Sequence, residues 1–156
     1  LSRAVTRWQY TLPSLAGDRM VPGTIRITRE DIDPGKILQE AQSSTIGALV
    51  SFLGVVRDDG IERMDLEAYE EVEEEELARI REQAIARFAV SHVDIIHRVG
   101  MLSVGDHIVM IVVGASHRKA AFQGCEFIID RIKESVPIWK KEYTSDGSRW
   151  VAGEHE

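Results

Sequence analysis

Cysteine, proline and aromatic residues are all scarce in this sequence of 156 residues. The chain has one cysteine, four prolines and 6% aromatic residues, and no apolar run approaches the roughly 18 residues that a membrane span requires. A lone cysteine excludes an internal disulfide, so a disulfide-stapled secreted domain is excluded and a reducing cytoplasm is the expected location. At 44% apolar residues, the chain has enough material for the core of one globular domain.

Charge is unevenly distributed along the chain. The 26 acidic and 19 basic residues give a net charge of −7. Residues 58–76 alone contain eleven acids and one base, so the rest of the chain carries +3. The overall balance argues against a long nucleic acid as a partner, whereas the basic remainder allows a local site for a small anion.

Local patterns predict the elements of the first half. Residues 1–23 show no sustained hydrophobic period, so we expect a loosely ordered arm there, before one domain over 24–156. Alternation over 24–28 predicts a strand, and Asp33 followed by Pro34 predicts the start of a short helix.

The almost wholly apolar run 46–56 predicts a central strand that is buried on both faces. A turn at 58–60 and the alternation over 64–68 then predict a strand that returns beside it as a hairpin.

The second half is predicted to contain two long helices, two more strands and a final hairpin. In chain order we expect a helix at 70–88, strands at 92–99 and 107–113, a helix at about 119–135, and a hairpin formed by 139–143 and 149–151. The glutamates at the start of the first helix form its solvated face, and Pro137 ends the second helix. This order predicts an α+β fold in which helices pack on a mixed, mainly antiparallel sheet.

Several familiar catalytic motifs are missing. The chain has no Walker-type loop, no Gly-x-Gly-x-x-Gly, no Gly-x-Ser-x-Gly and no His-Glu-x-x-His. Its five histidines and one cysteine show no metal-ligand spacing, so we expect neither a metal nor a cofactor. Cys125 lies on the apolar stripe of the 119–135 helix, which is typical of a small buried thiol and not of a nucleophile.

Cationic residues lie at the ends of several predicted elements, where binding sites are commonly built. One ends the 46–56 strand, two come just before the 119–135 helix, one lies in its last turn and one follows Pro137. In that order they are Arg57, His117, Arg118, Lys133 and Lys140. Backbone N–H groups at the helix start would add to an anion site, and phosphate fits such a site best.

Simpler roles for these five residues stay open on spacing alone. Arg57 and Arg118 would form ordinary surface ion pairs, and His117 would cap the helix. Lys133 would pair with Asp130 three residues earlier, and Lys140 would belong to a solvated basic patch. The anion site is therefore a hypothesis at this point.

Four short motifs contain these cations. They are FLGVVR at 52–57, HRVG at 97–100, SHRKAAF at 116–122 and, after Lys133, VPIWKKE at 136–142. In order and spacing they resemble the large, catalytic subunit of molybdopterin synthase over about residues 24–151. The resemblance implies a fold of the α/β hammerhead type.

The resemblance also implies a sulfurtransferase reaction and a partner. Two sulfurs are inserted into cyclic pyranopterin monophosphate, or precursor Z, to make the dithiolene of molybdopterin. The sulfur comes from the C-terminal Gly-Gly thiocarboxylate of a small ubiquitin-like subunit, and a homodimer of the large subunit binds two small subunits as a heterotetramer. A phosphate and an anionic thiocarboxylate would both be attracted to a cationic pocket.

Residue roles follow from the same resemblance. It implies that Arg57, His117 and Arg118 bind the substrate or its phosphate, and that Lys133 and Lys140 are catalytic. We expect Lys133 next to the carbonyl of the tail and Lys140 as acid/base or substrate clamp, and the sequence allows these two roles to be exchanged.

The chain departs from the family at the end of the final hairpin. Some members have another arginine soon after the Arg-Trp pair and donate it to the site of the neighbouring subunit. Here VAGE follows Trp150. Arg149 is the candidate that replaces this arginine in binding substrate.

Other function classes remain. The chain would otherwise be a non-catalytic module that binds a ubiquitin-like partner or a phosphorylated small molecule. The presence of both Lys133 and Lys140 favours the enzyme, because a docking module needs no lysine pair in its pocket. A phosphate-ester hydrolase is disfavoured, because the chain lacks metal ligands and an activated nucleophile.

Overall fold

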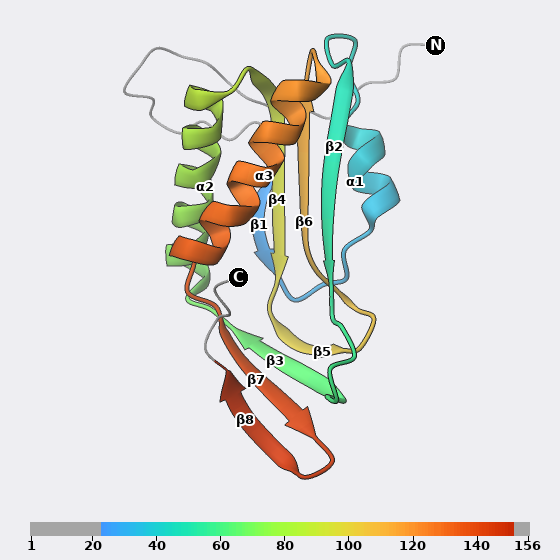
Figure 1. The fold of residues 1–156 in the computed structure, drawn as a ribbon, viewed down its shortest axis with the longest axis vertical. Helices are drawn as coiled ribbons and strands as arrows, with labels where there is room; N and C mark the ends of the chain where they lie inside the picture. The colour runs from blue at the N-terminus through green and yellow to red at the C-terminus, as the bar shows by residue number, and fades with distance from the viewer. Residues whose placement is uncertain (1–22, 152–156) are drawn as a thin grey trace.

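Two four-stranded sheets organise the chain, and Figure 1 shows one above the other. The computed structural model describes residues 23–151. Sheet A has the order β1 (Ile25–Thr28), β4 (Val90–Arg98), β6 (His107–Ala115) and β2 (Ala48–Val55). Sheet B has the order β5 (Gly100–Ser103), β3 (Arg63–Glu67), β7 (Trp139–Thr144) and β8 (Gly147–Val151). Within the described residues β1 and β4 pair in parallel and the other pairs are antiparallel, which confirms the predicted α+β class.

Helix α1 (Pro34–Ala41) begins where the sequence predicts. The carboxylate of Asp33 accepts a hydrogen bond of 3.2 Å from the backbone N–H of Lys36, and Pro34 takes the first helical position, where no N–H is needed. The helix packs on one face of sheet A. The buried side chains of this small core are Ile32, Ala41, Ile96, Met110 and Val112.

Helices α2 (Glu70–Arg87) and α3 (Arg118–Ser135) cover the opposite face of sheet A (Figure 1). Leu77 and Ile80 of α2 and Ile128 of α3 are completely buried in the main core, against strands β4 and β6. Each such side chain contributes roughly 1.5–3 kcal/mol through burial. This packing fixes where both ends of α3 lie relative to the two sheets.

The apolar run 46–56 forms β2, but the prediction of a central strand was wrong. Strand β2 lies at the edge of sheet A, and β4 and β6 are its central strands. Helix α3 packs on one face of β2 and helix α1 on the other, so both faces carry apolar side chains, but the residues of β2 are half-buried or exposed and not buried as predicted. Strand β6 is the one strand paired with β2 among the described residues. Apolarity on both faces therefore reports the two helical layers and not the position within the sheet.

The hairpin predicted for 46–56 and 64–68 was also wrong. After β2 the chain leaves sheet A. Strand β3 belongs to sheet B, where it pairs with β5 on one side and with β7 on the other. Strand β5 was not predicted, because Gly100 and Gly105 mark this segment as the link between the strands predicted at 92–99 and 107–113. It begins at Gly100, whose φ of +93° lets the chain turn from β4 into sheet B.

The final hairpin of β7 and β8 forms as predicted, and it gives sheet B two different faces. One face covers a third core, whose buried side chains are Val56, Ile61, Met64, Leu66 and Leu102. The other face exposes Trp139 and Trp150, which are 58% and 54% exposed. In β7, Trp139 is exposed and the five residues that follow it are half-buried.

The predicted arm at 1–23 lies outside the described residues except for Gly23. Within residues 23–151, none of the helices is both long enough and apolar enough to cross a membrane.

Candidate functional site

The candidate cations lie at two ends of the molecule. Helix α3 starts at the end of sheet A that is distant from sheet B, and it finishes next to sheet B (Figure 1). His117 and Arg118 are at its start, and Lys133 is in its last turn. Lys140 and Arg149 lie on β7 and β8 of sheet B, and Arg57 follows the end of β2 that is nearer to sheet B.

The start of α3 has the properties of an anion site. His117 is the N-cap residue, but its side chain makes no capping hydrogen bond, so the capping role left open by the sequence is not observed. Arg118 and Lys119 occupy the first turn, which contains no acidic residue. Positive side chains at the N-terminus of a helix are destabilising, because they lie at the positive end of the helix dipole. A bound anion would offset this repulsion.

A surface cavity of about 550 Å³ lies against this helix start. Its lining residues are Gly47, Ala48, Ser116, His117, Arg118 and Lys119. A glycine is required at position 47, where the loop before β2 comes close to the loop before α3. A Cβ there would lie only 2.2 Å from the carbonyl oxygen of Ser116. The short loop before β2 therefore meets the loop before α3 and forms the cavity wall.

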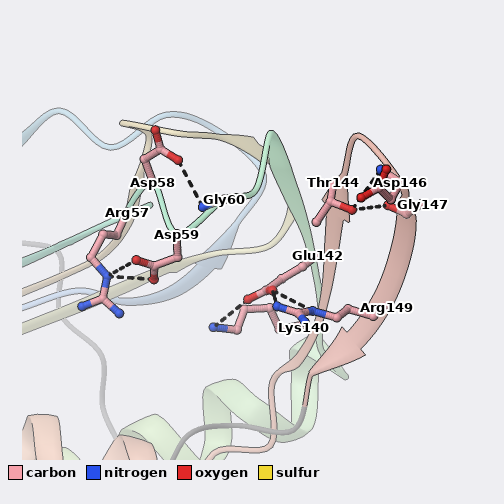
Figure 2. A network of polar contacts seen from close by, with 10 residues as sticks. All are labelled: Arg57, Asp58, Asp59, Gly60, Lys140, Glu142, Thr144, Asp146, Gly147 and Arg149. Carbon is pink, nitrogen blue, oxygen red and sulfur yellow. Dashed lines mark hydrogen bonds and ion pairs between the residues drawn. The ribbon is translucent and has the colours of Figure 1, made fainter.

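At the sheet B end, a carboxylate joins two of the candidate residues (Figure 2). One oxygen of Glu142 lies 4.0 Å from Lys140 Nζ. The other accepts hydrogen bonds from Arg149, at 3.0 Å from Nη2 and 3.3 Å from Nε. Glu142 was not singled out in the sequence, although its spacing of two residues from Lys140 on a predicted strand places both on one face.

Arg57 is also paired with an acid of its own neighbourhood. Its Nε lies 2.8 Å and 3.0 Å from the two oxygens of Asp59, as Figure 2 shows. The ordinary surface pair that the sequence left open for Arg57 is thus present. Lys133 is exposed, and the structure shows no ion pair between it and Asp130 within the described residues.

The structure separates two groups that the resemblance assigns to one reaction. Arg118 and Lys133 are fifteen residues apart on α3, which corresponds to about 22 Å along the helix axis. Arg57, Lys133, Lys140 and Arg149 belong to elements near sheet B, whereas His117 and Arg118 do not. One copy of the chain does not bring all six candidates to one place.

Among residues 23–151, burial shifts the pKa values of three titratable groups. Burial lowers the pKa of His97 from 6.5 to about 4, although its hydrogen bond to the carbonyl of Arg98 opposes this. Burial raises the pKa of Cys125 to about 11, which fits an inert thiol and not a nucleophile. Burial and the neighbouring Glu76 raise the pKa of Glu73. Among residues 23–151 no cluster of histidine, cysteine and carboxylate side chains is suited to a metal ion.

Comparison with known proteins decides the family. A sequence profile described as MoaE protein matches residues 27–135. The chain is 40% identical over 129 residues to the molybdopterin synthase catalytic subunit of Pyrococcus abyssi, an alignment that covers 80% of this chain and 87% of that protein. The chain belongs to the MoaE family.

Solved structures agree with a MoaE fold. The crystal structure of molybdopterin synthase from Staphylococcus aureus superposes with a TM-score of 0.77 at 37% identity, covering 82% of this chain and 96% of that one. A protein–protein complex of subunits 1 and 2 of the molybdopterin-converting factor from Helicobacter pylori matches with a TM-score of 0.69 at 23% identity, over 84% of this chain and 90% of that one. The second likeness shows that the fold is shared.

All four MoaE-like motifs of the sequence lie on described residues. Three of them end or begin at element boundaries: FLGVVR closes β2, SHRKAAF opens α3 and VPIWKKE opens β7. The fourth, HRVG, links β4 of sheet A to β5 of sheet B. The motifs therefore mark the places where the chain passes between sheets and helices, and their charged side chains stand at those junctions.

Proposed function

We propose that this chain is the catalytic subunit of a molybdopterin synthase. It transfers sulfur from the C-terminal thiocarboxylate of a small ubiquitin-like subunit to precursor Z and so makes the dithiolene of molybdopterin. The observation that carries the proposal is the pairing of an anion cavity at the start of α3 with the lysines Lys133 and Lys140 near sheet B, in a chain of the MoaE family. Both anions of the reaction then have cationic sites.

The two lysines are the proposed catalytic residues. Lys133 lies next to the carbonyl of the donor tail, and Lys140 acts as acid/base or substrate clamp. A positioned proton donor or acceptor typically contributes about 10²–10⁴ to a rate. Arg57 and Arg149 add positive charge at the same end, each aligned by a carboxylate of its own chain.

The separation along α3 leads to a two-copy site. His117 and Arg118 are too far from Lys133 on one chain to hold the phosphate of a substrate that Lys133 also touches, because about 22 Å of helix lies between them. In a homodimer, the start of α3 from one copy can meet the sheet B end of the other. Each dimer then contains two sites, and one small subunit binds at each.

Reconstitution tests the function directly. The purified chain is mixed with thiocarboxylated small subunit and precursor Z, and dithiolene formation is measured. The proposal predicts turnover with both partners and none when either is omitted. Binding of the small subunit or of precursor Z without dithiolene formation would instead identify the non-catalytic docking module.

Light scattering tests the assembly. The account predicts a dimer alone and a heterotetramer with the small subunit. A monomer at micromolar concentration, with and without the partner, would contradict the two-copy site. We place the reaction in the cytoplasm, where the single buried thiol of Cys125 stays reduced.

A further inference from the structure

Glu142 lies on the inner face of sheet B together with two of the candidate site residues. In the register of β3 and β7, Glu142 is opposite Met64 and Lys140 is opposite Leu66. Met64 and Leu66 are buried in the third core, so the side chains opposite them face the same side. Arg149 of β8 is directly opposite Glu142 and shares this face.

The carboxylate of Glu142 serves a different cation with each oxygen. Oε1 faces Lys140 Nζ at 4.0 Å, and Oε2 accepts two hydrogen bonds from the edge of the Arg149 guanidinium at 3.0 and 3.3 Å (Figure 2). The Glu142 side chain is 12% exposed, against 27% for Lys140 and 68% for Arg149. An almost buried anion is thus placed between a partly buried lysine and an exposed arginine.

This arrangement is unlike an ordinary surface ion pair. Exposed pairs contribute little, because water screens both charges and the long side chains lose freedom. Here the carboxylate is only 12% exposed and belongs to the face of sheet B that carries Met64 and Leu66, so water screens its charge less than at an open surface. Without the carboxylate, Lys140 and Arg149 would repel each other and spread apart.

We propose that Glu142 is a positioning residue for sulfur transfer. Its charge keeps the ammonium of Lys140, 4.0 Å away, on the side of the reacting group, and its two hydrogen bonds align Arg149 beside it. Glu142 itself does not touch substrate. The inference rests on the proposed function, because it assigns Glu142 a role through Lys140.

The test is the Glu142→Gln variant, which keeps the size of the side chain and removes its charge. Under single-turnover conditions, we expect the rate of dithiolene formation to fall roughly tenfold or more, up to the hundredfold that a displacement of about 1 Å can cost. The dissociation constant for precursor Z should not rise, because the local positive charge increases. Glu67→Gln is the matched control: Glu67 is exposed on β3 of the same sheet, and its loss should leave the rate unchanged.

A double mutant separates positioning from general support of the fold. In a Lys140→Ala background, Glu142→Gln should have almost no further effect, because the residue that it positions is gone. A second full decrease there, or a wild-type rate in the single variant, would overturn the proposal. If Glu142→Gln does not fold, Glu142→Asp is measured in both backgrounds with the same expectation, since its shorter carboxylate no longer reaches both cations.

Failure of this inference is distinguishable from failure of the proposed function. If the wild-type chain makes no dithiolene in the complete mixture, the proposed function is wrong. If the wild type is active and the Glu142 variants match it, only the positioning role is wrong.

Discussion

The two ends of helix α3 carry positive side chains in opposite electrostatic settings. At its start, Arg118 and Lys119 occupy the positive end of the helix dipole, with no acidic residue in the first turn. At its end, Lys133 complements the negative end of the dipole, and the nearby Lys140 and Arg149 share the carboxylate of Glu142. Within residues 23–151, no ion pair joins the start of α3 to an acidic side chain, whereas the sheet B end has the carboxylate of Glu142.

This difference indicates different tasks. Cations without a protein counter-ion are suited to binding an anion from solution, such as a phosphate. Cations that are held by a partly buried carboxylate have fixed positions, which chemistry requires more than binding does. We therefore propose that the two ends of one helix divide substrate binding from catalysis, and variants at each end should differ in what they impair.

The largest effect is expected at the sheet B end. Lys133→Ala and Lys140→Ala should each lower the turnover of the reconstituted enzyme by about 10²–10⁴, the usual contribution of a positioned proton-transfer group. Both variants should still bind the small subunit, because its globular surface provides most of the contact and only its tail enters the site. The measurement is single-turnover dithiolene formation at saturating partner and substrate.

Arginine at either position sharpens this prediction. A guanidinium stays protonated and has a different shape, so Lys133→Arg and Lys140→Arg should recover little activity. Near-wild-type rates for both arginine variants, with loss of activity at raised salt, would show that the lysines only attract the anionic tail.

At the start of α3 the expected effect is on binding. Arg118→Ala should weaken precursor Z by about 1.5–3 kcal/mol, the scale of a lost charge-assisted hydrogen bond, with little effect on the rate at saturation. Arg57→Ala, at the sheet B end that the other copy brings to the same site, should weaken binding on the same scale. Titration calorimetry measures both, with Arg79→Ala on the exposed face of α2 as the control. Unchanged affinity in both variants would place the phosphate elsewhere.

A buried histidine at the C-terminal end of β4 gives a prediction about stability and not about activity. Because burial lowers the pKa of His97 from 6.5 to about 4, the folded protein keeps this ring neutral. The stability that this provides is complete above pH 6.5 and is lost as the pH falls toward 4, by up to about 3 kcal/mol. In His97→Gln the free energy of unfolding should decline less over this interval. Equal pH dependence in the two proteins would contradict the buried neutral ring.

The smallest effect is expected at Cys125. Its thiol is buried on α3 and its pKa is raised to about 11, so it should not react with thiol reagents until the protein is unfolded. Cys125→Ala should retain full sulfur transfer. A large loss of turnover in this variant, without loss of stability, would require a cysteine step that the present account does not contain.

Short-range signals predicted most of the elements correctly. Asp33 with Pro34 fixes the start of α1 through neighbouring groups alone, and the turn before Gly147 fixes the β7–β8 hairpin in the same way. Strand partners that are distant in sequence left no local signal. Strand β3 pairs with β7, more than seventy residues later, so the hairpin predicted from proximity was wrong.

The residues of the site and their separation along α3 could be predicted from the sequence, but the pairing of Lys140 and Arg149 through Glu142 could not. The motifs identify the cations, yet they do not state that α3 separates Arg118 from Lys133. That separation was implicit in the predicted helix at 119–135, because a helix of this length sets its two ends more than 20 Å apart, at about 1.5 Å per residue. Glu142 was missed because an acid directly after two lysines looks like ordinary surface charge until the register places it on the inner face.

The most direct test of the two-copy site is a mixed dimer, in which one copy carries a variant at the start of α3 and the other a variant at its end. Arg118→Ala and Lys133→Ala chains with different affinity tags are coexpressed, and the mixed dimer is purified through both tags. If the start of α3 from one copy serves the lysines of the other, one of the two sites in each mixed dimer is intact. The mixed dimer should then show about half of the wild-type turnover, although each parent variant is severely impaired at subsaturating precursor Z. Turnover no higher than that of the parents would contradict the account, because it would mean that each chain builds its site alone.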